Sequence, residues 1–258
     1  MWCKNARVSI ATFLDAIKLV PDSEDAFWAD SIPTPTGMVF GGQVLAQALI
    51  AAGQTVDPDR HAHSLHAYFL RGGDLTQRIR FEVERLRDGR SFSTRNVNAL
   101  QAGRVTLTLA ASFQLDQEGL QHGEPMPVVA PPDSVTSMSD QPVNEETRRA
   151  RDFLNAIGVF DLRNVTRSAE SSPLGDEEHL VWMRLNADLT GAPPLLHAAL
   201  LAASSDFYTS GPVLHRHGAR PLSAGVRIAS LDHAMWFHRQ ARIDQWLLVR
   251  STSTAAAG

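Results

Sequence analysis

The pattern of hydrophobic and polar positions repeats a short unit. Residues 44–52 (VLAQALIAA) and 195–203 (LLHAALLAA) are runs of small and apolar residues of helical length. Each run is followed by a related segment, SLHAYFLR at 64–71 and SLDHAMWFHR at 230–239, the second with two inserted residues. A helix followed by a strand, used twice in one chain, predicts two similar domains packed together.

The region after the first small-residue run predicts an antiparallel meander. The β-rich or alternating segments are residues 64–70, 79–86, 91–100 and 105–113. Tight-turn signals separate them at Asp88-Gly89 and at Ala102-Gly103. Because one helix precedes these consecutive strands, we expect a sheet wrapped around that helix. The small residues of the helix fit this arrangement, since an enclosed helix has little room for bulk.

The remaining pattern predicts the other elements and the domain boundaries. We expect a short amphipathic helix at 11–20, a short strand at 27–28, and a first long helix at 41–53. The second half predicts a charged helix at 145–157, a strand at 181–185, a helix after Pro193-Pro194, a loop at 211–225 and a strand at 246–253. A Pro-, Gly- and Ser-rich connector at 116–144 separates a first domain, 1–115, from a second, 145–258.

Composition narrows the classes of function. A hydrophobic content of 43% and a charged content of 20% are those of a globular protein with an ample core. The net charge of -4 gives no electrostatic reason to expect nucleic acid. Cys3 is the only cysteine, which excludes disulfide and thiolate-metal frameworks. With no apolar run near the roughly 18 residues that span a membrane, and no signal peptide, we expect a cytoplasmic protein without cofactor or metal.

Five segments in order resemble the acyl-CoA thioesterase II family. They are VFGGQV at 39–44, HSLHAYFLR at 63–71, RDGRSFS at 87–93, AASFQ at 110–114 and DHAMWFHR at 232–239. The resemblance covers nearly the whole chain and implies an α+β double hotdog, in which two antiparallel sheets each wrap around a long helix. It also implies a hydrolase of lipid metabolism that converts acyl-CoA to free fatty acid and CoA, working as a homo-oligomer.

The resemblance also implies catalytic residues. In that family an aspartate, a hydroxyl residue and a glutamine hold the water that attacks the thioester. The aspartate corresponds to Asp206, at the end of the second helix, and the hydroxyl to Ser230, where the family usually has threonine. A thioester is already activated, so a carboxylate that orients and partly deprotonates water is suited to this reaction. Serine keeps the hydroxyl of threonine but lacks the methyl group that restricts its rotamer.

The expected glutamine maps beyond Gly258. The first unit runs 48 residues from His66 to Gln114, and the same run from His233 would end near position 281. We therefore expect a second hotdog that lacks about two strands, and impaired hydrolysis. Gln114 holds the place of that glutamine in the first unit, but Gln54 and Thr55 stand where an aspartate would be needed. The alternative is a non-catalytic acyl-CoA-binding or remnant protein; a hotdog hydratase fits less well.

Other polar residues have competing interpretations. His66 and His233 could act as bases, but histidines in half-buried strands are more often hydrogen-bonded structural residues. The pair His215 and His217 lacks a third metal ligand. The glycines at 41–42 could cradle a phosphate at a helix start, although close approach of two backbones is the favoured interpretation. Arginines at 87, 90 and 95 could meet CoA phosphates, and this possibility stays open.

Overall fold

The computed structural model of the chain describes residues 8–34, 37–142, 148, 159–165, 178–207, 209–219 and 226–256. The elements of its first half are α1 (Ile10–Ala16), β1 (Val20–Ser23), β2 (Ala26–Ala29), α2 (Gly41–Gly53), β3 (Arg60–Phe69), β4 (Ile79–Asp88), β5 (Phe92–Gln101) and β6 (Arg104–Leu115). Those of its second half are η1 (Pro132–Ser134), β7 (Phe160–Val165), β8 (Glu178–Leu185), α4 (Pro194–Ser205), α5 (Gly211–Arg216), β9 (Asp232–Trp236) and β10 (Leu247–Thr252).

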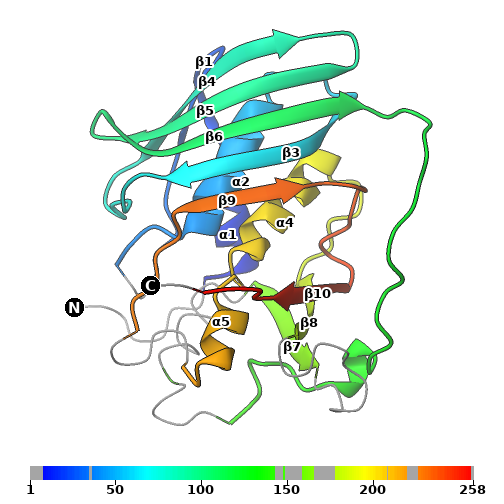
Figure 1. Cartoon of the computed structure of the whole chain (residues 1–258). Helices are drawn as coiled ribbons and strands as arrows, with labels where there is room; N and C mark the ends of the chain where they lie inside the picture. The colour runs from blue at the N-terminus through cyan, green and yellow to red at the C-terminus, as the bar shows by residue number, and fades with distance from the viewer. Residues whose placement is uncertain are drawn as a thin grey trace.

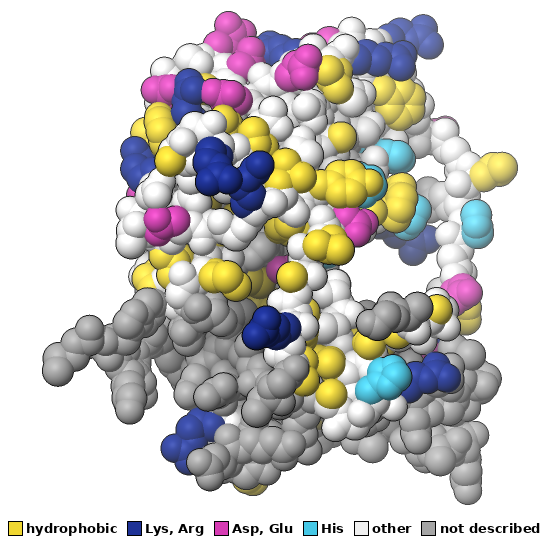
Figure 2. All heavy atoms as spheres, turned by 60° about the vertical axis from the view of Figure 1, so that its left-hand side comes forward, with side chains coloured by type: hydrophobic (Ala, Val, Ile, Leu, Met, Phe, Trp, Pro, Cys, Tyr) yellow, Lys and Arg dark blue, Asp and Glu magenta, His cyan; other side chains and the backbone are white. Residues whose placement is uncertain are grey.

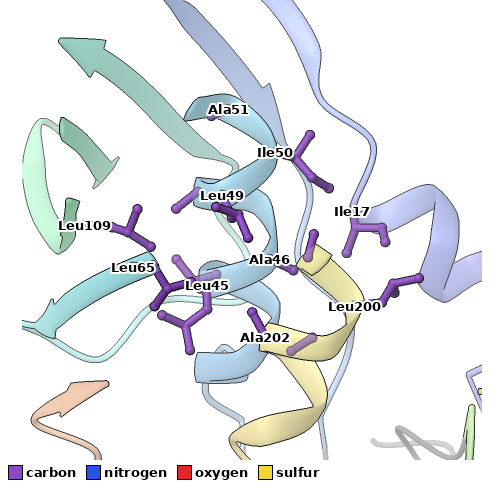
Figure 3. Close-up of a cluster of buried hydrophobic side chains, with 14 of the residues drawn as sticks. Ile17, Leu45, Ala46, Leu49, Ile50, Ala51, Leu65, Leu109, Leu200 and Ala202 are labelled. Atoms are coloured by element: carbon purple, nitrogen blue, oxygen red, sulfur yellow. The ribbon is translucent and has the colours of Figure 1, made fainter. Parts of the chain in front are cut away.

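Helix α2 forms the core of the first unit. Residues 42–52 are all buried, and the strands follow the order β1-β2-β4-β5-β6-β3 beside it. Figure 3 shows the close-up: Leu45 and Leu49 point toward Leu65 of β3 and Leu109 of β6, all of them fully or nearly fully buried. The predicted sheet around a small-residue helix is therefore present, and apolar burial on the inner face of the sheet holds the two together.

The strands of the first unit are joined by the predicted tight turns. Between β4 and β5 the backbone N–H of Gly89 donates to the carbonyl of Phe92 at 2.9 Å. Between β5 and β6 the residues Ala102 and Gly103 both have positive φ, 48° and 71°. Two consecutive left-handed residues are typical of a two-residue hairpin turn, whose twist matches that of the flanking strands.

Strand β9 of the second half extends the sheet of the first. It pairs antiparallel with β3, from Ser64 opposite Trp236 to Tyr68 opposite Asp232. The result is a seven-stranded sheet, while β10, β8 and β7 form a separate three-stranded sheet. Helix α4 lies against α2 on the inner side; in Figure 3 Ala202 of α4 lies on the side that faces α2, whereas Leu200 points toward α1. The two long helices are thus enclosed between the sheets (Figure 1).

The second half repeats the element order of the first. The elements β7, β8, α4, β9 and β10 follow the order of β1, β2, α2, β3 and β4, with α5 inserted between α4 and β9. In the first unit the hairpin β5-β6 lies between β4 and β3. Among the described residues of the second unit, no strand lies between β10 and β9, and Figure 1 shows these two strands well separated.

Most of the predicted elements are confirmed, with a shorter α1 and longer strands than expected. The predicted loop at 211–225 is wrong in part, because α5 occupies its first residues. The segment begins with Gly211 and Pro212, which disfavour a helix interior, but proline is tolerated in the first turn of a helix. The predicted charged helix at 145–157 lies outside the described residues, apart from Arg148. No helix in the described ranges is long and apolar enough to cross a membrane.

The contact between α2 and α4 makes Gly42 sensitive to substitution. A Cβ at Gly42 would lie 2.3 Å from the backbone oxygen of Ala203. Because backbone cannot move aside cheaply, Gly42→Ala should destabilise the protein by about 1–3 kcal/mol, which lowers Tm by roughly 3 °C or more. Gly119→Ala is the control, since its Cβ would meet nothing within 4 Å. Equal calorimetric Tm values for the two variants would contradict this close packing.

Candidate active site

Asp206 and Ser230, the two site residues expected from the sequence, lie together where the two long helices meet. Asp206 is the C-terminal cap of α4, with φ -71° and ψ -13°. Its Oδ2 accepts a hydrogen bond from the backbone N–H of Gly42 at 3.0 Å. Its Oδ1 accepts a longer one, 3.4 Å, from Ser230 Oγ. The second unit therefore supplies a carboxylate and a hydroxyl, and the first unit supplies a backbone amide.

Asp206 acts as a capping group for a helix to which it does not belong. The N-cap residue of α2, Phe40, makes no side-chain capping hydrogen bond. Capping oxygens usually come from the N-cap side chain itself. Here the oxygen belongs to a residue 164 positions away in the chain from Gly42. The positive end of the α2 dipole favours a negative charge at this place.

The glycines at the start of α2 permit this approach. A Cβ at Gly41 would lie 2.9 Å from Asp206 Oδ2, and one at Gly42 would meet the backbone of α4. The next residue, Gln43, is fully buried; its side chain accepts from the N–H of Ile32 and donates to the carbonyl of Asp30. These contacts support the interpretation of this motif as a close-approach site for backbones rather than a phosphate cradle.

Aromatic stacking holds the same junction on its other side. The ring of Phe40 stacks on that of Phe207, with centroids 4.9 Å apart and planes 16° from parallel. Phe207 follows Asp206 directly and also makes an edge contact with Phe160 at 5.5 Å. Aromatic pairs of this kind contribute about 0.5–1.5 kcal/mol beyond their buried area. This packing of Phe40 and Phe207 helps to hold the start of α2 and the end of α4 in place on either side of the Asp206–Gly42 hydrogen bond.

Burial makes the Asp206 carboxyl unusually basic. It raises the pKa of Asp206 above its ordinary value of 3.8, because a charge is poorly solvated there. Three contacts oppose this effect: the nearby His233, the N–H of Gly42 and the hydroxyl of Ser230. The raised pKa shows that desolvation outweighs them. An ionised carboxylate in such a place is a stronger base than one in water, as a general base for water requires.

The two histidines of the repeated motif have different surroundings. His233 on β9 is buried, and its Nε2 lies 2.9 Å from Ser205 Oγ. Burial lowers its pKa, so the imidazole is neutral near neutral pH. His66 on β3 lies on the outer face, with Nε2 3.6 Å from Asp232 Oδ2. The hydrogen bond of His233 agrees with the structural interpretation given to histidines of this kind.

A pocket lies at the opposite end of α4. It has a volume of about 330 Å³ and is lined by residues from the start of α4, the ends of β3 and β6, and the segment after β9. Gln114, Pro194 and His197 are among them. Asp206 is roughly 18 Å from Pro194 along the helix, at 1.5 Å per residue. Gln114 therefore lies by this pocket, not beside Asp206.

In the first unit, the position that corresponds to Asp206 is structural. Thr55 is buried, donates its hydroxyl proton to the carbonyl of Ala52 and accepts a hydrogen bond from Arg95 Nε, both at 2.8 Å. Arg95 is 1% exposed and also contacts Thr55 O and Asp88 Oδ1. The first unit therefore has no carboxylate at this position, and Arg95 is engaged inside the fold rather than free for a CoA phosphate.

The structure provides no support for a metal site. In the described ranges, no group of three or more His, Cys, Asp or Glu side chains could hold an ion. His217 is exposed, and the side chain of His215 lies outside what is described. Sequence reasoning missed two contributors to the site, the N–H of Gly42 and the Ser205–His233 pair. The paired glycines hinted at the first; nothing local signalled the second, because its partners are 28 positions apart.

Comparisons with known proteins point to one family along both halves of the chain. Models of the acyl-CoA thioesterase N-terminal and C-terminal domains match residues 30–114 and 132–258. The chain is 34% identical over 253 residues to human acyl-coenzyme A thioesterase 8, covering 94% of this chain and 79% of the human protein. It is 36% identical over 233 residues to acyl-CoA thioesterase 2 of Haemophilus influenzae, covering 85% and 78%.

Solved structures agree on the architecture. An acyl-CoA thioesterase II from Mycobacterium marinum has a TM-score of 0.77 and 35% identity, with 95% of this chain and 86% of that chain covered. A hot dog protein from Alicyclobacillus acidocaldarius has a TM-score of 0.72 at 22% identity, covering 97% and 89%. The second likeness bears on the fold alone. Together they confirm the predicted α+β hotdog architecture.

The raised pKa of Asp206 predicts a pH-dependent effect of Asp206→Asn on stability. Below the ordinary carboxyl pKa, folded and unfolded chains both carry the proton, and no charge is buried. As pH rises through the raised folded pKa, the wild type loses stability that the asparagine variant keeps. The variant should therefore gain Tm relative to wild type as the pH rises above about 4. A difference that does not change with pH, or matches that of the exposed control Asp59→Asn, would contradict the burial of this charge.

Proposed function

This chain belongs to the acyl-CoA thioesterase II family, whose activity is the hydrolysis of acyl-CoA to free acid and CoA, and we propose that Asp206 and Ser230 carry the reaction. The observation that supports this site is the buried carboxylate of Asp206, between the start of α2 and Ser230. A carboxylate is costly to bury. Its retention at the junction of the two hotdogs therefore favours a chemical role.

The proposed nucleophile is a water molecule. Asp206 accepts a proton from the water as its oxygen attacks the thioester carbonyl, and Ser230 fixes the orientation of the water by hydrogen bonding. The resulting tetrahedral oxyanion needs a hydrogen-bond donor. We assign this role to the backbone N–H of Gly41, because the N–H of Gly42 donates to Asp206 and that of Gln43 donates to the carbonyl of Phe40. When the intermediate collapses, the C–S bond breaks and CoA leaves as a thiolate. Because a thiolate is a good leaving group, no strong acid is required, and the proton on Asp206 returns to solvent or to the thiolate.

A third group would complete this arrangement. In the first unit Gln114 lies on β6, paired beside β3. In the second unit the strand that corresponds to β3 is β9, so a glutamine on a strand between β9 and β10 would approach the Asp206 side of the sheet. The printed 258 residues contain no such strand among those described. We therefore propose that residues 1–258 turn over slowly and that a glutamine supplied at this edge restores the rate.

The same Asp206–Ser230 site also fits a second function, the binding of acyl-CoA without hydrolysis. The hydrogen bond from the exposed Ser230 to Asp206 is long, 3.4 Å, and the described residues place no amide side chain beside the pair. A site of this kind can hold an acyl-CoA without cleaving it. Titration calorimetry with a non-hydrolysable acyl-CoA, run beside a thiol-release assay, separates the two functions. Binding without release supports a non-catalytic acyl-CoA-binding protein, while release that depends on Asp206 supports the hydrolase.

We propose that the protein self-associates through an apolar surface on β3 and β9. Large hydrophobic side chains are exposed on or next to β3 and β9: Tyr68 (51%), Leu231 (73%) and Trp236 (61%). Figure 2 shows hydrophobic side chains beside histidines on one side of the molecule. An apolar surface of this kind is compatible with the predicted homo-oligomer. The predicted location is the cytoplasm.

Asp206→Asn should reduce kcat by about 100-fold or more, because general-base catalysis typically contributes at least that factor. Ser230→Ala should reduce kcat less than Asp206→Asn does. Ser230→Thr, which keeps the hydroxyl, should have a kcat within a few-fold of wild type. Release of the CoA thiol from a series of acyl-CoAs measures these rates. Asp59→Asn, an exposed carboxylate change, is the matched control. If Asp206→Asn hydrolyses acyl-CoA at the wild-type rate, the assignment is wrong.

A C-terminal extension tests the third group. The extension supplies two antiparallel strands, copied from β5 and β6 so that the copy of Gln114 falls beside β9. We expect kcat to rise by about tenfold or more, since positioning a reacting water is a proximity effect. The matched control carries alanine at the copied glutamine. Equal rates for the two extended chains would exclude a catalytic amide at this edge, and a rise in both would indicate stabilisation only.

A further inference from the structure

The end of α4 is tied to β9 by a buried hydrogen bond that precedes Asp206 by one residue. His233 is 8% exposed, and its Nε2 lies 2.9 Å from Ser205 Oγ. We propose that His233 is a positioning residue for hydrolysis: through Ser205 it fixes the last turn of α4 and hence the direction of the Asp206 carboxylate. This inference rests on the proposed function, because it concerns the same carboxylate.

The direction of each hydrogen bond follows from the proton count. Ser205 Oγ lies 2.8 Å from the carbonyl oxygen of Ala202, which can only accept, so the single hydroxyl proton points there. The hydroxyl oxygen must therefore accept from His233, which places the proton of the neutral imidazole on Nε2. The chain of bonds runs from β9 through the histidine and serine to the backbone of α4.

Such a tie matters most at this helix end. The last carbonyls of a helix have no partners within it, and the final turn frays unless other groups hold it. Asp206 is the cap of this last turn, and its carboxylate must meet both Gly42 and Ser230. A displacement of about 1 Å in a catalytic group can reduce a rate by roughly 100-fold. Fixing Ser205 restricts the position of the adjoining Asp206.

The charges around His233 define its pH behaviour. Asp206 faces it from α4, and Asp232 precedes it on β9. From β3, the residue opposite is Ala67, while the neighbouring His66 pairs with Asp232 on the outer face. While neutral, His233 positions Asp206 without neutralising it. Once protonated in acid, it places a positive charge near Asp206 and weakens that carboxylate as a base, so both groups contribute to the acidic limb of the rate profile.

Substitutions can separate these roles. His233→Gln keeps an N–H donor near the place of Nε2 but cannot titrate, and His233→Leu removes the donor. Ser205→Ala removes the acceptor and Ser205→Thr keeps it. We expect His233→Leu and Ser205→Ala each to lower kcat about tenfold with little change in KM, and their double variant to lose no more than either alone. His233→Gln should keep most of kcat and change the acidic limb of the pH profile.

Ser204→Ala is the matched control. Ser204 Oγ donates to the carbonyl of Leu201 at 2.8 Å, as Ser205 Oγ does to Ala202, but it is not bonded to the histidine. Its kcat should stay near wild type. Equal losses in Ser204→Ala and Ser205→Ala would overturn the proposal, because they would indicate a general effect of helix-end packing.

A readout independent of turnover comes from nitrogen NMR of histidine-labelled protein. Wild type should show His233 as the neutral tautomer with its proton on Nε2, and Ser205→Ala should lose that preference. The opposite tautomer in wild type would overturn the proposal. Asp206→Asn run in parallel separates two failures. If Asp206→Asn keeps the wild-type rate, the proposed function fails; if it loses activity while His233→Leu and Ser205→Ala do not, only this inference fails.

Discussion

The hydrogen bond from the N–H of Gly42 to Asp206 Oδ2 is the contact on which the candidate site depends. It can form only if the start of α2 and the end of α4 approach at backbone distance, which the absence of side chains at Gly41 and Gly42 allows. The same requirement accounts for the small residues along both helices. Bulkier residues would separate the helix axes, and the carboxylate would then face neither the amide nor Ser230.

This contact has opposing effects on the stability of the protein, and the unfavourable one makes the carboxylate of Asp206 more basic. An oxygen that caps α2 is favourable for that helix, but burial of its charge is unfavourable and raises the pKa of Asp206. Helix dipole, hydroxyl and amide offset only part of this effect. The fold therefore holds a base that would be more stable protonated, as expected where activity rather than stability has determined the residue. Stacking of Phe40 on Phe207 beside it helps to hold the arrangement.

Local pattern predicted those parts of the fold that local physics determines. The small-residue run predicted a helix at 41–53, which are the observed ends of α2. The turn residues at 88–89 and 102–103 located two hairpins. Resemblance of motifs, rather than periodicity, singled out Asp206 and Ser230. The pairing of β9 with β3 could not be read from either strand, because a strand pattern specifies a face and not a partner. The Ser205–His233 bond likewise depends on how α4 and β9 are placed in space.

The C-terminal ends of α2 and α4 differ, although the two helices belong to repeated units, and only the end of α4 has a carboxylate suited to act as a base. At the end of α2, Thr55 receives the guanidinium of buried Arg95, and a carboxylate there would form an ion pair instead of staying free to act as a base. At the end of α4, the partners of Asp206 among the described residues are an amide and a hydroxyl, and no described arginine is bonded to it. A base must be buried without a cation to neutralise it. At this end of the helix pair, the described partners of Asp206 hydrogen-bond its carboxylate without pairing it with a guanidinium, which suits a base.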